Sequence, residues 1–351
     1  MTGSGRAAEV RTLVVNPGSS SLKISLLDDG REAHDDGGPY DAIGVRFVHG
    51  GSRTSAVLVT AAVLDELEQV SGLAPLHNPP ALEAARDLVE RHPGVPVVAC
   101  FDTAFHATMP AAATTYALPR EWRERWGLRR YGFHGLSHSY AARRAAELLR
   151  RPLEELRIVT CHLGGGASLC AVRGGRSVDT TMGMTPMEGL VMQTRSGSVD
   201  PGLMLHLLQS RGVTPDELER VLDRESGLLG LTGTSGDLRE VTAAIGSGST
   251  EAVAGLAVYV HRLVREIGAM AAATGGVDAL VFTGGVGEHS PDVRRAAVDR
   301  LGFLGLGIDE LLNPEVSGDA DVSASGATAS TLVVTAREDL EIEREVRAVL
   351  A

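Results

Sequence analysis

Three glycine-rich turns are the first candidates for chemistry, because backbone N–H groups and hydroxyls in such turns can bind phosphate. Their sequences are NPGSSSLK (residues 16–23), HLGGGAS (162–168) and FTGGVGEHS (282–290). None of them has the GxxxxGK[ST] spacing of a P-loop. An ordinary hairpin turn explains any one of them alone. Three such turns at the ends of apolar strands, the last just before a helix start at Ser290-Pro291, favour nucleotide binding.

Two arginines lie next to glycines and other small residues, where a guanidinium can reach an anion. They are Arg46 in GVRFVHGG and Arg195 in MQTRSGSVDP. A guanidinium can bind a carboxylate or a phosphate with two parallel N–H donors. Most arginines are solvated surface residues, so only the local sequence distinguishes these two as candidate anion clamps.

Carboxylates follow two of the apolar strands. Asp102 comes directly after VVACF, and a carboxylate at the C-terminal edge of a strand is well placed to face a ligand cleft. Glu338 and Asp339 follow TLVVTA, where they could bind Mg²⁺ directly or through water. For that pair alone, the preference of acidic side chains for a helix N-terminus is the simpler explanation.

Six histidines lie in apolar or glycine-rich surroundings, and one of them is a candidate donor to a transferring phosphoryl group. A zinc site is disfavoured, because the two histidines spaced four residues apart have no carboxylate or thiol at ligand spacing. The remaining histidines are expected to be structural hydrogen-bonding groups. The six are His49, His77, His106, His134, His138 and His162.

The elements that must position these residues form two similar units in the sequence. From Thr12 an apolar strand runs into the first turn, a second strand follows, and Asp29-Gly30 leads to a third. The same layout begins again at Arg157, with Gly174-Gly175 as its second hairpin turn. Helices and strands alternate after each unit. The sequence therefore predicts a duplicated α/β fold whose two halves face each other across a cleft, and it resembles the ribonuclease-H-like fold of the actin-like ATPases.

Apolar periodicity and capping residues predict the helices. The helix at 78–91 is the best marked, with Asn78 as its cap and Pro79 in its first turn. Further helices are expected at about 139–150, 200–209, 214–224, about 250–273 and 337–350, and one more opens at Ser290-Pro291. The later strands are VPVVACFDTAF, DALVFTGG and TLVVTA.

Composition excludes several classes of function. A chain of 351 residues exceeds one average domain, and its 43% hydrophobic content can fill a large core. The net charge of −12 argues against nucleic acid and anionic membranes as partners. The sequence predicts neither a signal peptide nor a membrane-spanning run, and Cys100, Cys161 and Cys170 are expected to be buried, reduced thiols. We therefore expect a cytoplasmic protein.

Taken together, eight motifs resemble those of the acetate kinase family and follow one another in family order. They are VVNPGSSSLK, APLHNPPALEA, VVACFDTAFHATMP, RRYGFHGLSH, IVTCHLGGGAS, MGMTPMEGL, TRSGSVDPGL and FTGGVGEHS. The resemblance implies reversible phosphoryl transfer from ATP to acetate, giving acetyl phosphate and ADP, with Mg²⁺ (or Mn²⁺) as the metal. It also implies a homodimer, and in each chain an N-terminal domain of residues 1–152 plus 338–351 and a C-terminal, nucleotide-binding domain of residues 153–337.

Carried over to the matching positions, the resemblance assigns roles to individual residues. Arg46 and Arg195 would clamp the acetate carboxylate and the migrating phosphoryl group. Asp102 would orient an arginine and the water shell of the metal, and His134 would donate to the phosphoryl oxygens. The metal would be held by Asn16 and Glu338, and the acid would contact Val48, Leu76, His77, Phe133 and Pro186. The nucleotide would contact Ser19, Ser21, Lys23, His162, Gly164, Gly165, Gly166, Asp237, Leu238, Arg239, Gly284, Gly285, Val286 and Gly287.

Three departures from the family pattern bear on this assignment. The stretch from Lys23 to Arg46 is several dozen residues shorter than its equivalent, so a strand and a helix are expected to be missing. Gly165 replaces an asparagine, and Gln193 replaces a glycine. Because the charged residues are retained, we predict a divergent but active enzyme. The alternatives are a propionate or butyrate kinase, a non-catalytic nucleotide-binding relative, and a structural α/β protein, which would leave both arginines unexplained.

Overall fold

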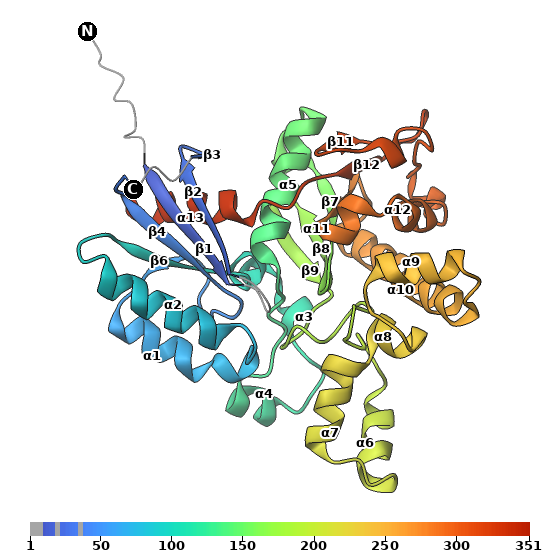
Figure 1. Cartoon of the computed structure of the whole chain (residues 1–351), viewed down its shortest axis with the longest axis horizontal. Coiled ribbons are helices and arrows are strands. Elements are labelled where there is room, and N and C mark those ends of the chain that lie inside the picture. Colours follow the sequence, from blue (N-terminus) through green and yellow to red (C-terminus); the bar gives the residue numbers. More distant parts are fainter. Residues whose placement is uncertain (1–9, 18–21, 34–37) are drawn as a thin grey trace. The chain divides into compact units, whose positions relative to one another are not determined.

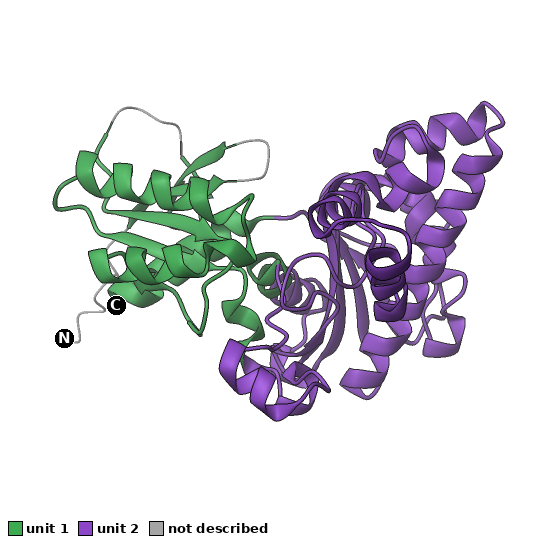
Figure 2. Cartoon of the chain, turned by 90° about the horizontal axis from the view of Figure 1, so that it is seen from below, with its two compact units in different colours: residues 1–107, 134–140, 337–351 green, residues 108–133, 141–336 purple. Residues whose placement is uncertain are grey.

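The computed structural model describes residues 10–17, 22–33 and 38–351. The chain forms two compact units (Figure 2). Unit 1 comprises residues 1–107, 134–140 and 337–351, and unit 2 comprises residues 108–133 and 141–336. This division assigns residues 108–133 and 141–152 to unit 2, whereas the domain bounds expected from the sequence separate at 152/153.

Each unit contains one six-stranded mixed sheet, and the two sheets have the same strand order (Figure 1). The order is β3-β2-β1-β4-β6-β5 in unit 1 and, from the corresponding edge, β9-β8-β7-β10-β12-β11 in unit 2. In both, an antiparallel meander is followed by parallel strands, and the last strand is antiparallel again. The predicted duplicated α/β fold is therefore confirmed.

The strands of unit 1 are β1 (Arg11–Pro17), β2 (Leu22–Asp28), β3 (Arg31–Glu32), β4 (Ala42–Phe47), β5 (Val57–Leu58) and β6 (Val97–Phe101). Those of unit 2 are β7 (Arg157–Leu163), β8 (Ala167–Arg173), β9 (Arg176–Thr180), β10 (Ala279–Thr283), β11 (Ala320–Asp321) and β12 (Ser330–Val333). The parallel strands β6 and β10 are buried along their whole length, as expected of strands covered on both faces.

Helices cover both faces of the unit 1 sheet. On one face, α1 (Ala61–Gln69) and α2 (Asn78–Arg91) pack their leucines and alanines against the valines and phenylalanines of β4 and β6. On the other face, α13 (Glu338–Leu350) packs Ile342 and Val346 against the sheet. This helix passes so close to β4 that a Cβ on Gly44 would lie 2.5 Å from Cγ2 of Ile342.

The long helix α10 (Thr250–Thr274) is the main support of the unit 2 sheet and packs across β7, β8 and β9. Ser249 caps its N-terminus and Gly275, in the left-handed conformation, ends it. Among the described residues, the remaining α-helices are α3 (Ala111–Thr114), α4 (Arg120–Trp126), α5 (Gly135–Leu149), α6 (Pro201–Ser210), α7 (Pro215–Arg220), α8 (Gly227–Thr232), α9 (Leu238–Gly246), α11 (Gly284–His289) and α12 (Pro291–Val298).

Two local predictions are wrong. The cap of α2 is His77, because the side chain of Asn78 is used elsewhere: its Oδ1 accepts from the His49 N–H at 3.1 Å and its Nδ2 donates to the His49 carbonyl at 2.8 Å. The third glycine-rich segment is not an open turn, since residues 284–289 form the short helix α11.

Because the stretch from Lys23 to Arg46 is short, only a short connection joins β3 to β4. Residues 33–41 lead from β3 to β4, and their described part contains no helix or strand. The corresponding connection of unit 2, from β9 to β10, contains the helices α6 to α10. Across the described residues, no helix combines the length and hydrophobicity that crossing a bilayer requires.

Candidate active site

Arg46 and Asp102 are brought together by neighbouring parallel strands of unit 1. Arg46 lies on β4, opposite Cys100 of β6, and Asp102 follows the end of β6. Arg46 Nε donates to Asp102 Oδ1 at 3.0 Å and Nη2 donates to Oδ2 at 2.7 Å. The remaining nitrogen, Nη1, donates to Oδ1 of Asn16 at 2.9 Å. The carboxyl ends of parallel strands thus place a fixed guanidinium at one edge of the sheet.

The charge of Arg46 is stabilised by its surroundings. Burial alone disfavours the charged form, but attraction to Asp102 and Glu338 and the hydrogen bonds to Asp102 outweigh burial and raise the pKa of Arg46. Glu338 is the first residue of α13. Three of the predicted site residues therefore act on Arg46: Asn16 and Asp102 accept its hydrogen bonds, and Glu338 adds electrostatic attraction.

His134 belongs to the same unit and has an unusual backbone. Its φ angle is +57°, in the left-handed region that non-glycine residues adopt rarely. The next residue, Gly135, donates its N–H to the Asp102 carbonyl at 3.0 Å, and a Cβ at position 135 would collide with that carbonyl. Such strain concentrates at functional positions. The contact ties the partly exposed His134 to the strand end that carries Asp102.

The residues expected to contact the acid are divided between the units. Val48, Leu76 and His77 belong to unit 1, and Phe133 and Pro186 to unit 2. Val48 and Phe133 are buried, whereas Leu76 is 38% exposed.

Arg195 is held by an aspartate in unit 2, as Arg46 is in unit 1. Its Nε donates to Oδ1 of Asp223 at 3.1 Å, and its Nη1 donates to the Pro186 carbonyl at 3.1 Å. Two sequence-predicted residues, Arg195 and Pro186, are thus in direct contact. Asp223 was missed by the sequence analysis, because it lies among charged helical residues with no motif of its own.

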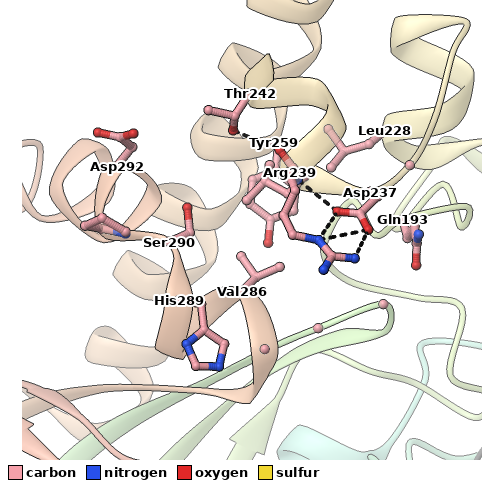
Figure 3. Close-up of a pocket in the computed structure, with 16 residues that line it drawn as sticks. Gln193, Leu228, Asp237, Arg239, Thr242, Tyr259, Val286, His289, Ser290 and Asp292 are labelled. Atoms are coloured by element: carbon pink, nitrogen blue, oxygen red, sulfur yellow. Dashed lines mark hydrogen bonds and ion pairs between the residues drawn. The ribbon is translucent and has the colours of Figure 1, made fainter. Parts of the chain in front are cut away.

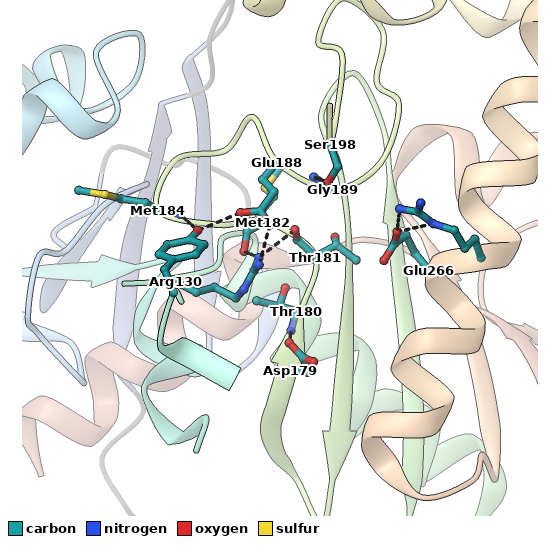
Figure 4. A network of polar contacts seen from close by, with 12 residues as sticks. Arg130, Asp179, Thr180, Thr181, Met182, Met184, Glu188, Gly189, Ser198 and Glu266 are labelled. Atoms are coloured by element: carbon teal, nitrogen blue, oxygen red, sulfur yellow. Dashed lines mark hydrogen bonds and ion pairs between the residues drawn. The ribbon is translucent and has the colours of Figure 1, made fainter. Parts of the chain in front are cut away.

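A polar network fixes the loop that carries Pro186 (Figure 4). Tyr116 donates its hydroxyl to Glu188 at 2.9 Å and accepts the N–H of Met184 at 2.9 Å. Arg130 Nη2 binds the other oxygen of Glu188 at 2.6 Å, and its Nη1 donates to two backbone carbonyls just before the loop. Burial and the charge of Glu188 raise the pKa of Tyr116 to about 12, so its hydroxyl stays a donor at neutral pH.

Unit 2 contains a pocket of about 440 Å³ that is large enough for much of a nucleotide (Figure 3). It is bounded by the turn after β7, by the N-terminus of α9, and by α10, α11 and the start of α12. Seven of the predicted nucleotide residues line it: Gly164, Gly165, Asp237, Leu238, Arg239, Gly285 and Val286.

Other predicted nucleotide residues lie near this pocket without lining it. His162, Gly166, Gly284 and Gly287 belong to its supporting segments, β7, the turn after it, and α11. A Cβ on Gly284 would lie 2.8 Å from the Leu163 carbonyl, so the glycine lets α11 pack closely on the end of β7. Lys23 is exposed on β2 of unit 1, and Ser19 and Ser21 lie outside the described residues.

Tyr259 and Gln193 are among the polar lining residues that no predicted role includes. Tyr259 of α10 is only 4% exposed, its hydroxyl has no hydrogen-bond partner among the described residues, and burial raises its pKa. Gln193 lies against the turn after β7, where a Cβ on Gly165 would be 3.0 Å from its Oε1. The two departures at positions 165 and 193 are therefore in contact.

The comparisons with known proteins agree with this geometry. A model of the acetokinase family matches residues 31–344. An acetate kinase of Synechococcus sp. (strain JA-2-3B'a(2-13)) is 54% identical over 301 residues, which cover 86% of this chain and 74% of that relative. An acetate kinase of Clavibacter sepedonicus is 51% identical over 310 residues, 88% of this chain and 78% of the relative.

Solved structures give the same result. The acetate kinase of Porphyromonas gingivalis superposes with a TM-score of 0.89 at 35% identity, covering 97% of this chain and 100% of that chain. A propionate kinase from Francisella tularensis has a TM-score of 0.87 at 32% identity, with coverage of 97% and 100%.

Proposed function

The chain belongs to the acetokinase family, and we propose that it is an acetate kinase that transfers the γ-phosphoryl group of ATP reversibly to acetate. The main support is the pair of arginines that are each held by one aspartate, Arg46 by Asp102 and Arg195 by Asp223. A fixed guanidinium suits both the carboxylate of an acid and the oxygens of a phosphoryl group.

In the forward reaction an acetate oxygen attacks the γ-phosphorus. A new O–P bond forms, the bond to the β–γ bridging oxygen breaks, and ADP leaves as acetyl phosphate is formed. Acetate is already ionised at neutral pH, so no general base is needed. Charge spreads over the equatorial oxygens of the loose transition state, and we assign Arg46, Arg195 and His134 as the donors to those oxygens. Asp102 and Asp223 keep the two guanidinium groups in place.

A divalent metal is expected to accompany the nucleotide, and we propose Mg²⁺. Its ligands would be Asn16 and Glu338, whose oxygens lie around Arg46 together with Asp102. Among the described residues, no group of three or more His, Cys, Asp or Glu side chains is placed to form a metal cage. This donor set fits Mg²⁺, which keeps several waters and uses one or two carboxylates plus substrate phosphates. The bound ion would neutralise phosphate charge, and Mn²⁺ would suit the same oxygens.

The chemistry of the acid-contacting residues supports acetate over longer acids. Val48, Leu76, Phe133 and Pro186 are the apolar residue types expected beside a methyl group. Discrimination against one extra methylene is worth only about 1–3 kcal/mol in an apolar pocket. Propionate is therefore the strongest competing substrate, in keeping with the propionate kinase among the structural relatives.

We also propose that the enzyme is a cytoplasmic homodimer. Unit 2 exposes several apolar side chains on and beside α6, α8 and α10, and a partner surface that covered them would remove apolar area from water. They are Val199, Leu203, Leu205, Leu231, Val253 and Val258. A cytoplasmic location is supported by the use of ATP and by three free, buried cysteines.

Trapping of acyl phosphate as the hydroxamate tests the activity. The protein is incubated with ATP, Mg²⁺ and acetate, with propionate and butyrate in parallel. We expect turnover that prefers acetate and is lost in Arg195→Ala. ATP binding without acyl phosphate formation from any acid would instead identify a non-catalytic relative, and faster turnover with propionate would identify a propionate kinase.

A further inference from the structure

The turn between β7 and β8 presents no side chain to the nucleotide pocket of unit 2. Gly164, Gly165 and Gly166 form the turn, which is closed by a hydrogen bond from the Gly164 N–H to the Gly166 carbonyl at 3.0 Å. A phosphate bound there meets backbone N–H groups. Any side-chain donor to that phosphate has to come from another segment.

Gln193 is the side chain that the fold brings to this turn. Its N–H donates to the Gly165 carbonyl at 3.1 Å, and its own carbonyl accepts the N–H of Leu229 at 3.0 Å. Its carboxamide makes no hydrogen bond within the described part of the chain, yet it lines the pocket beside Asp237 (Figure 3). The main chain of Gln193 is therefore fixed while its polar end faces the ligand space.

The side chain of Gln193 lies in a space that is open only because two neighbouring residues are glycines. A Cβ on Gly165 would be 3.0 Å from Oε1 of Gln193, and a Cβ on Gly236 would be 2.5 Å from its Cγ. Both distances are shorter than ordinary van der Waals contact. Gly165 and Gly236 thus border a slot that the glutamine fills, and a side chain at either position would displace it.

We infer that the carboxamide of Gln193 contacts the phosphates of the bound nucleotide, and that Gly165 leaves the room this contact needs. The inference rests on the proposed function in one respect, that the pocket binds a nucleotide. A carboxamide carries two N–H donors, and phosphate oxygens are strong acceptors. The phosphates, rather than the base, are indicated because Gln193 touches the glycine turn and lies two residues before Arg195, the predicted clamp of the phosphoryl group.

Direct nucleotide binding tests the contact. Calorimetry with ATP, ADP and adenosine is compared between the wild type and Gln193→Ala. We expect ADP and ATP to bind about 10- to 150-fold more weakly to the variant, the loss typical of one charge-assisted hydrogen bond. Adenosine, which has no phosphate, should bind equally to both. Equal loss for all three ligands, or no loss for any, would overturn the inference.

A double-mutant cycle tests the part played by Gly165. Gly165→Ala should weaken ADP binding in the wild-type background, because the added methyl group displaces the carboxamide. The same change should have less than about a twofold effect when Gln193 is already alanine. Gly268→Ala is the matched control, since nothing lies within 4 Å of a Cβ there. A Gly165→Ala effect of the same size in both backgrounds would show that the two residues are independent.

These experiments distinguish failure of the inference from failure of the proposed function. If the wild type binds ADP with this dependence on Gln193 but forms no acyl phosphate, the kinase proposal fails and the inference stands. If the wild type binds neither ADP nor ATP, the inference fails as well. Thermal melting of every variant in the absence of ligand shows that the changes in affinity do not come from unfolding.

Discussion

Asp102 holds Arg46 with both of its carboxylate oxygens, at 3.0 Å from Nε and 2.7 Å from Nη2. Asn16 accepts from the third nitrogen, so every guanidinium nitrogen has a partner. The arginine side chain is 13% exposed and the aspartate side chain 1% exposed. The guanidinium therefore has a fixed orientation, and in the proposed role little ordering would remain for an anion to impose.

Replacing Asp102 with asparagine should lower kcat by about 10²-fold, because Arg46 loses the charge that orients it. The unpaired buried charge should also lower the free energy of unfolding by about 3 kcal/mol. Steady-state kinetics and urea unfolding measure the two effects. Asp87→Asn is the control, since its ion pair with Arg91 is exposed and should change neither quantity. Wild-type kcat in Asp102→Asn would contradict the role given to this pair.

Asp223 should act through Arg195 as a positioning residue. Asp223→Ala is expected to lower kcat/KM about 10- to 100-fold, as the guanidinium loses one of its two anchors. Asp223→Glu should restore part of that loss. Glu219→Ala serves as the control, because Glu219 is exposed on α7. If alanine and glutamate at position 223 were equally harmful, position 223 would be only structural.

Tyr116 should affect the acid more than the nucleotide. Tyr116→Phe removes one of the two partners of Glu188, the other being Arg130, and leaves the Met184 N–H unpaired, so the loop with Pro186 loses part of its support. We expect KM for acetate to rise about 5- to 10-fold, a cost of 1–1.5 kcal/mol, with KM for ATP unchanged. The control is Tyr40→Phe, whose hydroxyl bonds His92 in unit 1. An equal rise of both KM values would argue against a specific role of the loop.

Glu345 should make the stability of the protein depend on pH. Burial, and then the charge of Glu341, raise the pKa of Glu345 to about 7, and Oε2 of Glu345 has no hydrogen-bond partner among the described residues. The folded protein therefore binds this proton more tightly than the unfolded chain does. The stabilisation is complete below pH 4.5 and is lost as the pH rises to about 7.

Chemical unfolding at pH 5 and pH 8 measures this effect. The loss between the two values should be about 2–3 kcal/mol larger in the wild type than in Glu345→Gln, which cannot titrate. The comparison of the two proteins removes the contribution of all other groups, including His49, whose pKa burial lowers. Identical pH profiles would show that Glu345 ionises normally.

The local pattern of residues was enough to predict that the fold consists of two similar units. Alternating apolar residues and glycine turns gave both meanders, and apolar periodicity gave α2 and α10 close to their observed bounds. The two arginines and the Gly-rich turns could be identified as candidates because arginines beside small residues and glycine-rich turns at strand ends are both suited to binding anions. These signals are local, since each depends on residues within a few positions of one another.

Contacts between distant positions were decided by the tertiary structure. Asp223 binds Arg195 although the two residues are 28 positions apart in the sequence. Asn78 does not cap α2, because its side chain bonds the backbone of His49 instead. In the sequence, Gly165 and Gln193 are two separate departures from the family pattern. The fold places the turn after β7 against the segment before Arg195, so the two residues are in contact. Strand register and helix packing set these distances to within ångströms. Because the two partners of such a contact lie far apart in the chain, no local sequence pattern contains both of them.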